Sequence, residues 1–225
     1  DPRSMERRGG RLIAGGQAVD VVYRRAVLSE LVDREDEVRD FLRAYAEGAA
    51  VFVNSFRCRL SEDKAFLALL TDEAFASMLT GDERAFVART VPWTRKLEER
   101  RTTKDERPVD LLTFVRDHRE GLVLKPAHGY GGRDVLVGDE TTPAQWDEAV
   151  RVGARQAWVV QERVAIPEEP FPTCEGGALG FEELKVNANP FYVRGGETGA
   201  VTRASRSAVI NVSAGGGSVP TFVVG

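Results

Sequence analysis

The sequence has 225 residues, 42% of them apolar and 29% charged, which is ordinary for a protein that buries a hydrophobic core in one large domain or two small ones. Its formal net charge of −4 gives no general attraction to nucleic acid or to an anionic membrane. No apolar run reaches the roughly 18 residues that a membrane span needs, and Cys58 and Cys174 show no CxxC spacing, which favours a reduced, cytoplasmic setting.

The first sixty residues predict a small strand–helix–strand unit. Val19–Tyr23 and Ala49–Asn54 are compact apolar strands, and Glu35–Glu47 between them carries apolar residues at helical spacing. Two strands joined in this way are expected to be parallel, and ligands gather at the carboxyl ends of such strands. Arg24 and Arg25 follow the first strand. They are either a solvated strand end or an anion site in which a guanidinium binds a carboxylate.

The next segment is predicted to be mainly helical. Ser61 is expected to cap a helix from Glu62 to Leu70, which places Lys64 in the first turn. A lysine at a helix N-terminus suits a phosphate group, although an ordinary surface lysine is the alternative. The charged run Lys96–Arg107 indicates a solvated helix or a mobile segment, and Pro108 is expected to start the following helix.

A glycine-rich turn between two short apolar strands is the most informative stretch of the chain. Leu122–Leu124 and Val135–Val137 predict the strands, and Gly129, Gly131 and Gly132 lie between them. Backbone N–H groups in such a turn form an anion-binding concavity, and Lys125 adds a point charge. The pattern is neither a Walker A loop nor a dinucleotide fingerprint. It therefore predicts either a phosphate-binding hairpin or a hairpin with a roomy turn.

The remaining elements follow in a simple order. Thr142 and Pro143 have the spacing of a helix start, and the strand Trp158–Val164 turns polar at Gln161 and Glu162. Pro167–Gly180 is expected to be a loop. Two strands, 182–193 and 200–212, are predicted to flank a hairpin turn at 194–199, and a second glycine loop follows at 213–218.

Taken in order, these motifs resemble the ATP-grasp superfamily over residues 15–225. They are most similar to its circularly permuted members, such as eukaryotic-type glutathione synthetase and glutathionylspermidine synthetase. The resemblance implies an α+β fold of two lobes, with a nucleotide-binding domain at 61–225 preceded by the partial βαβ subdomain at 1–60. It also implies ATP and Mg²⁺ as cofactors, and small-molecule carboxylate and amine substrates joined through an acyl phosphate.

The resemblance also implies roles for individual residues. Arg25 and Arg203 would be the catalytic arginines, with Arg206 in reserve for Arg203. In the relatives the hinge strand reads adenine with its backbone and holds ribose with an acidic residue, whereas the alternative for Gln161 and Glu162 is a polar pair on an edge strand. The implied ATP contacts are Lys64, Lys125, Tyr130, Gly131, Gly132, Gln161, Glu162, Val164, Gly215 and Gly216.

The metal site is where the sequence departs from the family pattern. The permuted relatives hold Mg²⁺ with a Glu-x-Asn pair that lies N-terminal to everything seen here. Because the chain begins at Asp1 and not at Met, the main ligands are expected on a preceding part, with Asn211 and Glu183 as weak substitutes. The leading hypothesis is the C-terminal part of an ATP-dependent carboxylate–amine ligase. The alternative is a non-catalytic nucleotide-binding or interaction domain. The sequence identifies neither the acid, the amine nor the oligomeric state.

Overall fold

The computed structural model spans residues 1–225 and describes residues 1–129, 131–210 and 216–222. Helices and strands are both abundant, so the predicted α+β class is confirmed. The chain divides into two compact units, Asp1–Glu62 and Asp63–Gly225. No helix among the described residues has the length and apolar character needed to cross a membrane.

The first unit contains the predicted parallel strand pair. Strands β4 and β5 run parallel, with Val22 opposite Phe52, and α1 and α2 lie between them in the chain. Val22 and Phe52 pack with Phe41 and Ala44 of α2 into one core, and Leu12 of an N-terminal three-stranded meander joins it. The elements are β1 Met5–Arg8, β2 Arg11–Ala14, β3 Gln17–Val19, β4 Val21–Tyr23, α1 Leu28–Asp33, α2 Arg39–Ala46, β5 Val51–Val53 and α3 Arg59–Glu62, with short 3₁₀ helices at Pro2–Ser4, Glu35–Glu37 and Phe56–Cys58.

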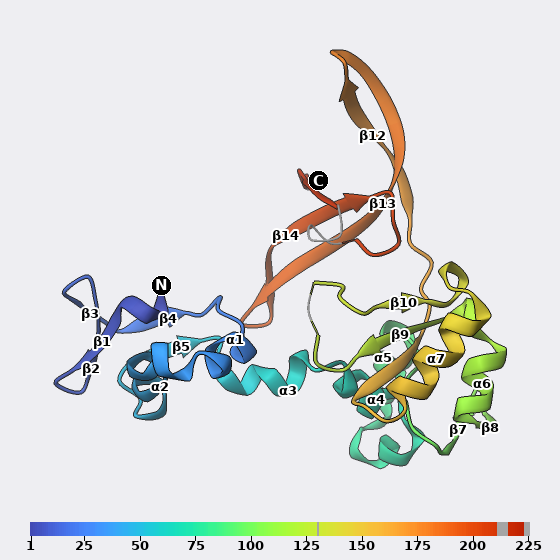
Figure 1. The fold of residues 1–225 in the computed structure, drawn as a ribbon, viewed down its shortest axis with the longest axis horizontal. Helices are drawn as coiled ribbons and strands as arrows, with labels where there is room; N and C mark the ends of the chain where they lie inside the picture. The colour runs from blue at the N-terminus through green and yellow to red at the C-terminus, as the bar shows by residue number, and fades with distance from the viewer. Residues whose placement is uncertain (130, 211–215, 223–225) are drawn as a thin grey trace. The chain divides into compact units, whose positions relative to one another are not determined.

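The second unit is built on an antiparallel sheet of strand order β10-β9-β11-β6. Helices α6 and α7 lie together against this sheet (Figure 1). Their buried residues Val115, Trp146 and Val150 join Leu124 and Val160 of the sheet in the main core. The elements are α4 Lys64–Thr71, η4 Glu73–Met78 (a 3₁₀ helix), α5 Gly81–Thr90, β6 Thr94–Lys96, β7 Arg101–Lys104, β8 Arg107–Asp110, α6 Leu111–Asp117, β9 Leu122–Pro126, β10 Leu136–Val137, α7 Pro143–Gly153 and β11 Trp158–Glu162, with 3₁₀ turns at Arg119–Gly121 and Gly138–Glu140.

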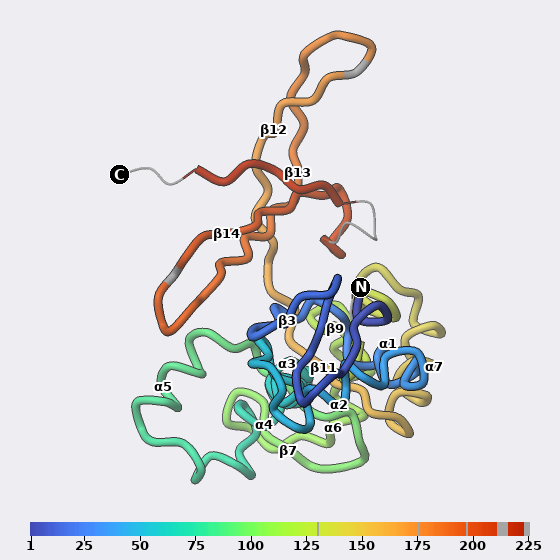
Figure 2. The backbone as a smooth tube through the Cα atoms, turned by 90° about the vertical axis from the view of Figure 1, so that its left-hand side faces the viewer, coloured from blue at the N-terminus to red at the C-terminus, as the bar shows by residue number. Residues whose placement is uncertain are grey.

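A second antiparallel sheet ends the chain, in the order β12-β13-β14-β15. Its strands are β12 Glu168–Glu175, β13 Ala178–Val193, β14 Gly196–Ser205 and β15 Gly217–Val219. Figure 2 shows how the chain runs out and back through β12, β13 and β14. The predicted hairpin between β13 and β14 is confirmed, but its turn is tighter than the predicted 194–199, because β13 ends at Val193 and β14 begins at Gly196. The loop predicted at Pro167–Gly180 is wrong, because β12 is an edge strand, and an edge strand tolerates Pro170 and Pro172.

Two helix starts differ from the prediction. Helix α4 begins at Lys64 and is capped by Asp63, whose carboxylate accepts from the Ala65 N–H at 2.9 Å. Ser61 does not cap it; its hydroxyl donates to the Cys58 carbonyl instead. Helix α6 begins after Pro108 and is capped by Asp110. Helix α7 starts as predicted after Thr142, which forms a capping box with Gln145, and Thr80 forms a capping box with Glu83 at the start of α5.

The charged run Lys96–Arg107 is neither a helix nor a structureless segment. It contains the end of β6, strand β7 and the tight turn into β8, in which Asp105 and Glu106 have positive φ. Leu97, the apolar residue near its start, is fully buried in the main core. Most charged residues of this run therefore lie on or between β-strands, and the composition of the run did not reveal these strands.

Candidate functional site

Strands β9 and β11 bring Lys125 and Gln161 together. Lys125 lies opposite Val159 and Gln161 opposite Val123, so the two polar side chains emerge on the same face of the sheet. The Lys125 Nζ donates to Gln161 Oε1 at 2.7 Å. Gln161 is 9% exposed, and β11 lies between β9 and β6. The edge-strand interpretation of Gln161 is therefore wrong.

Helix α4 brings a second lysine to the glycine-rich turn. Lys64 is the first residue of α4, and its Nζ donates to the Gly129 carbonyl at 2.7 Å. The backbone N–H of Lys64 also donates to the carbonyl of Ala127 at 3.2 Å. One residue earlier, the Asp63 carboxylate lies 2.6 Å from the ring of His128. The start of α4 and the first half of the turn are thus fixed to each other by three contacts.

The electrostatics of this pair are those of an anion site. Burial lowers the pKa of Lys125, and the nearby positive charge of Lys64 lowers that pKa further. Two ammonium groups held near each other in a partly buried place repel one another. A bound anion would relieve this repulsion, and its charge-assisted hydrogen bonds would stabilise both cations.

Both lysines line one cavity of about 370 Å³. Gly129, Gly131 and Gly132 of the turn form part of its wall, and Gln161, Glu162 and Arg163 form another part. Arg133 also lines it, and the rest of the wall is apolar, formed by Val123, Val135, Val137, Val164, Ile166, Ala208 and Val209. A few polar groups converging in a largely apolar cavity of this size are typical of a site for a small organic ligand.

Gly132 shows how closely the chain approaches itself at this cavity. Its φ is +75°, and a Cβ added there would lie 2.6 Å from Cγ1 of Val209. Val209 lies in the segment after β14, so the chain that leaves this strand reaches the glycine turn between β9 and β10. A side chain at position 132 would be both strained and in conflict with Val209.

A larger cavity of about 650 Å³ is lined by Glu162, Arg163 and Val164, together with residues of η4, α5 and Trp93. Neither lysine and none of the glycines of the turn lines it. The smaller cavity is therefore the candidate site, because Lys64, Lys125 and the glycines of the turn all line it.

The other predicted site residues are placed as follows. Glu162 ends β11 and lies 3.5 Å from the Lys104 ammonium, while Val164 is 59% exposed. Gly216 is buried just before β15. Arg203 lies on β14 opposite Asn187, outside the lining of the cavity, and its Nε is a buried nitrogen without a hydrogen-bond partner in the described part of the chain. Arg206, the reserve for Arg203, is paired with Glu182.

Arg25 belongs to the first unit, where it follows β4 and is exposed. Its neighbour Arg24 has a structural role. The Arg24 guanidinium donates to the carbonyls of Asn54 and Ala26 and to Cys58 Sγ, and it stacks over the Phe56 ring at 5.1 Å.

The residues that would hold Mg²⁺ are not apparent. Among residues 1–129, 131–210 and 216–222, no group of three or more His, Cys, Asp or Glu side chains is arranged to hold a metal ion. Glu183 is exposed on β13. Tyr130, Gly215 and the metal candidate Asn211 lie outside the described residues.

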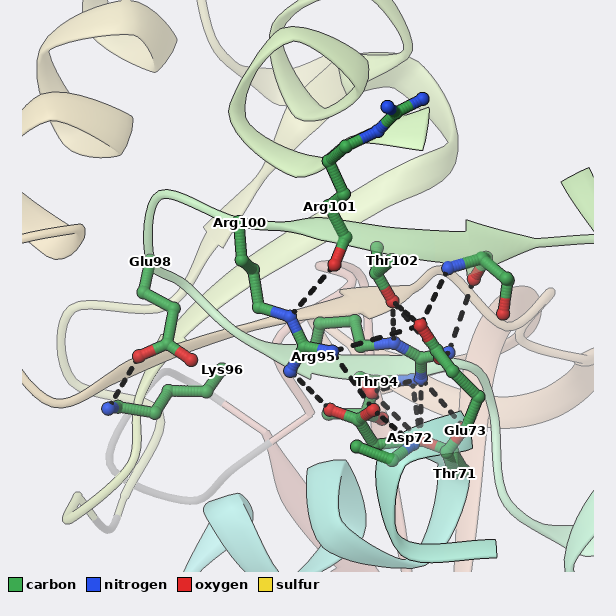
Figure 3. Close-up of polar contacts among 12 residues, drawn as sticks. Thr71, Asp72, Glu73, Thr94, Arg95, Lys96, Glu98, Arg100, Arg101 and Thr102 are labelled. Atoms are coloured by element: carbon green, nitrogen blue, oxygen red, sulfur yellow. Dashed lines mark hydrogen bonds and ion pairs between the residues drawn. The ribbon is translucent and has the colours of Figure 1, made fainter. Parts of the chain in front are cut away.

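Sequence reasoning missed Thr94 and the network behind it. Thr94 Oγ1 accepts from Gln161 Nε2 at 2.9 Å and donates to the Pro92 carbonyl at 2.8 Å. Behind Thr94, Figure 3 shows Arg95 and Arg100 meeting Asp72 and Glu73. The signal for Thr94 would have been the expected pairing of its strand with β11, which local patterns do not give.

Comparison with known proteins agrees with this architecture. The sequence matches the circularly permuted ATP-grasp type 2 family over residues 7–208. The chain therefore belongs to this family, as the order of its motifs predicted.

Three relatives illustrate the range of similarity. The chain is 28% identical over 226 residues to an uncharacterized protein of Synechocystis sp. strain PCC 6803, covering 95% of this chain and 44% of the relative. It is 28% identical over 231 residues to an uncharacterized protein of Mycobacterium tuberculosis strain H37Rv, covering 95% and 38%. It is 34% identical over 118 residues to a Frankia casuarinae protein provisionally named glutamate–cysteine ligase 2-2, covering 48% and 13%. The chain thus spans less than half the length of these relatives.

Proposed function

We propose that this chain is the nucleotide-binding part of an ATP-dependent carboxylate–amine ligase. The observation that carries the proposal is the convergence of Lys125, Lys64 and the glycine turn on one cavity with an apolar wall. Membership of a permuted ATP-grasp family supports ATP as the nucleotide. The name of the Frankia relative supports the joining of a carboxylate to an amine.

The cationic part of the cavity wall suits the phosphates of ATP, and the apolar part suits its adenine ring. The ammonium groups of Lys125 and Lys64 and the N–H groups of the Gly131–Gly132 turn would bind the phosphates. The valine-rich wall would bind the adenine ring, with the end of β11 beside it. Glu162, at that end, would accept a hydrogen bond from a ribose hydroxyl.

In the proposed reaction, a carboxylate oxygen of the acid attacks the γ-phosphorus of ATP, the bond from that phosphorus to the bridging oxygen breaks, and ADP leaves. The amine nitrogen then attacks the acyl carbon, inorganic phosphate leaves, and the nitrogen loses a proton to form the amide. Cations fixed around the transferring phosphoryl group would stabilise its charge in the transition state. Arg203 lies outside the lining of the cavity, but its buried Nε has no hydrogen-bond partner among the described residues, and it is our candidate for one of these cations.

Magnesium is expected to accompany ATP in this chemistry. The described residues do not form a site for it, so we assign its ligands to none of them. We propose that the ligands lie in the part of the relatives that this chain does not match.

Calorimetric titration with ATP and ADP, with and without Mg²⁺, tests the proposal. The wild-type chain should bind, and the Lys125→Ala and Lys64→Ala variants should bind about ten- to a hundredfold more weakly, because each loses a charge-assisted contact of about 1.5–3 kcal/mol. Lys96→Ala is the matched control. Lys96 lies on the same sheet but is exposed and paired with Glu98. An absence of binding heat at millimolar nucleotide would refute the proposed site.

The alternative function is a non-catalytic nucleotide-binding or interaction domain, which predicts the same binding. An activity assay on a protein as long as the relatives distinguishes the ligase from the non-catalytic domain. Release of ADP and phosphate that depends on an added carboxylate and amine supports the ligase, whereas binding without such turnover supports the alternative.

A further inference from the structure

A continuous chain of hydrogen bonds runs from the backbone of residue 92 to the ammonium of Lys125. Thr94 Oγ1 donates to the Pro92 carbonyl at 2.8 Å, Gln161 Nε2 donates to Thr94 Oγ1 at 2.9 Å, and Lys125 Nζ donates to Gln161 Oε1 at 2.7 Å. Thr94 is fully buried and Gln161 is 9% exposed, so water has little access to the middle of this chain.

The direction of each bond in this chain is determined by its ends. A backbone carbonyl only accepts, so the Thr94 hydroxyl must give its single proton to Pro92 and can only accept from Gln161. The amide NH₂ of Gln161 must then face Thr94, which leaves the amide oxygen facing Lys125. An ammonium only donates, and the amide oxygen is therefore the group it requires. With the amide reversed, two donors would face each other at Lys125.

We propose that Thr94 is a positioning residue for the phosphate-binding Lys125, and that it acts by fixing the orientation of the Gln161 amide. The inference rests on the proposed function insofar as Lys125 binds phosphate. Among the described residues, Gln161 Oε1 is the one hydrogen-bond acceptor of Lys125 Nζ, which leaves the other N–H groups of the ammonium available for a ligand. The amide oxygen holds Nζ at the cavity and does not compete for the whole ammonium.

The amide also offsets the cost of burying this cation. Burial and the charge of Lys64 both disfavour the protonated form of Lys125. A correctly oriented amide oxygen favours it, because a hydrogen bond to the charged form raises the pKa of a lysine. Loss of the Thr94 hydroxyl should therefore affect the protonation of Lys125 even when no nucleotide is present.

Two measurements on Thr94→Val and Thr94→Ser test the proposal. The first is the pH profile of acetylation of Lys125 by acetic anhydride in the nucleotide-free chain, read by peptide mass spectrometry. The second is the dissociation constant of ATP by calorimetry. Thr94→Val should move the acetylation profile to lower pH and weaken ATP binding about tenfold, as expected for one buried hydrogen bond. Thr94→Ser keeps the hydroxyl and should stay close to wild type in both.

Thr141→Val is the matched control, because among the described residues its hydroxyl bonds to the Gly138 carbonyl and to neither Gln161 nor Lys125. If Thr94→Val does not fold, Thr94→Ala takes its place in the comparison with Thr94→Ser. A folded variant without the hydroxyl that keeps the wild-type acetylation profile and ATP affinity overturns the proposal. So does an effect of Thr94→Val that persists in a Gln161→Met background, since the amide is then not the link.

The two proposals fail in different ways. If the wild-type chain does not bind ATP, the proposed function fails, and the acetylation profile still decides whether Thr94 controls Lys125. If ATP binds but Thr94→Val and Thr94→Ser behave alike, the positioning role fails and the nucleotide site stands.

Discussion

Replacement of Asp72 by alanine should destabilise the second unit by about 4 kcal/mol. Asp72 is 5% exposed, and its two oxygens accept from Arg100 at 2.5 and 3.0 Å. Breaking a buried ion pair typically costs about 3–5 kcal/mol, and the low end applies because the Arg100 side chain is 24% exposed and can be rehydrated. Asp72 also caps η4 through the Ala74 N–H, which adds about 1 kcal/mol.

The Asp72→Asn variant separates the cost of losing the ion pair with Arg100 from the cost of losing the helix cap. Asparagine keeps the cap and loses the charge, so its cost should be about 1.5–3 kcal/mol, the value of a hydrogen bond to a charged group. Burial by itself would raise the pKa of Asp72, but hydrogen bonds from Arg100 and Ala74 and the charges of Arg100 and Arg95 outweigh it and lower that pKa. The charge of Asp72 thus stabilises the fold above its unfolded pKa of about 3.8, and this contribution is lost as the pH falls through the lower, folded-state pKa.

Urea unfolding followed by tryptophan fluorescence measures these costs. The three tryptophans all lie in the second unit, and Trp93 is within cation–π distance of Arg95, a neighbour of Asp72 in the same network. Glu148→Ala is the control, because Glu148 pairs with Arg151 at similar distances on the surface and its loss should not move the midpoint measurably. A cost below about 1 kcal/mol for Asp72→Ala would refute the view that this buried network holds the unit together.

The other predictions concern the cavity and the core. Gly132→Ala should destabilise the chain by about 1–2 kcal/mol and weaken ATP binding, because alanine is strained at a φ of +75° and its Cβ would meet Val209. Unfolding and calorimetric measurements check the two effects. Gly121→Ala, where an added Cβ has open space, should change neither the stability nor the affinity for ATP. Trp146→Ala should cost about 3–5 kcal/mol by urea unfolding followed by circular dichroism, since Trp146 is fully buried and bonds to the Val115 carbonyl. The free energy of unfolding of the wild type should rise relative to that of Lys125→Met as the pH rises towards about 10.5, because the folded state holds the Lys125 proton less tightly than the unfolded state does. A difference that does not vary with pH would contradict the burial of this charge.

Local signals predicted much of this fold. The helix start predicted at Thr142 formed because a cap is decided by residues only three apart in sequence, here Thr142 and Gln145. The glycine hairpin formed between β9 and β10 because short apolar strands flank residues that permit a turn. The order of lysine, glycine turn and Gln-Glu strand also gave the family before any contact was known.

The features that the sequence did not predict are those that depend on residues far away in the chain. The run Lys96–Arg107 appeared solvated because charged residues dominate it and could pair locally, whereas Arg100 is paired with Asp72, 28 residues earlier. Pro167–Gly180 appeared to be a loop because prolines are rare in central strands, and its position at the edge of a sheet is not written in its own residues. The role of Thr94 likewise depends on a strand that lies 67 residues further along the chain.

The buried network and the proposed positioning of Lys125 meet at the edge strand β6. The outer backbone groups of Thr94 would be unpaired at such an edge, yet its N–H donates to the Thr71 hydroxyl at 3.1 Å and its carbonyl accepts from Arg95 at 2.8 Å. Arg95 is in turn held by Glu73 at 2.8 Å. The ion pairs therefore fix the backbone of Thr94, and its hydroxyl remains free to orient the Gln161 amide. It follows that changes in the ion pairs should weaken the fold and the site together, whereas removal of the Thr94 hydroxyl should weaken the site with a smaller loss of stability.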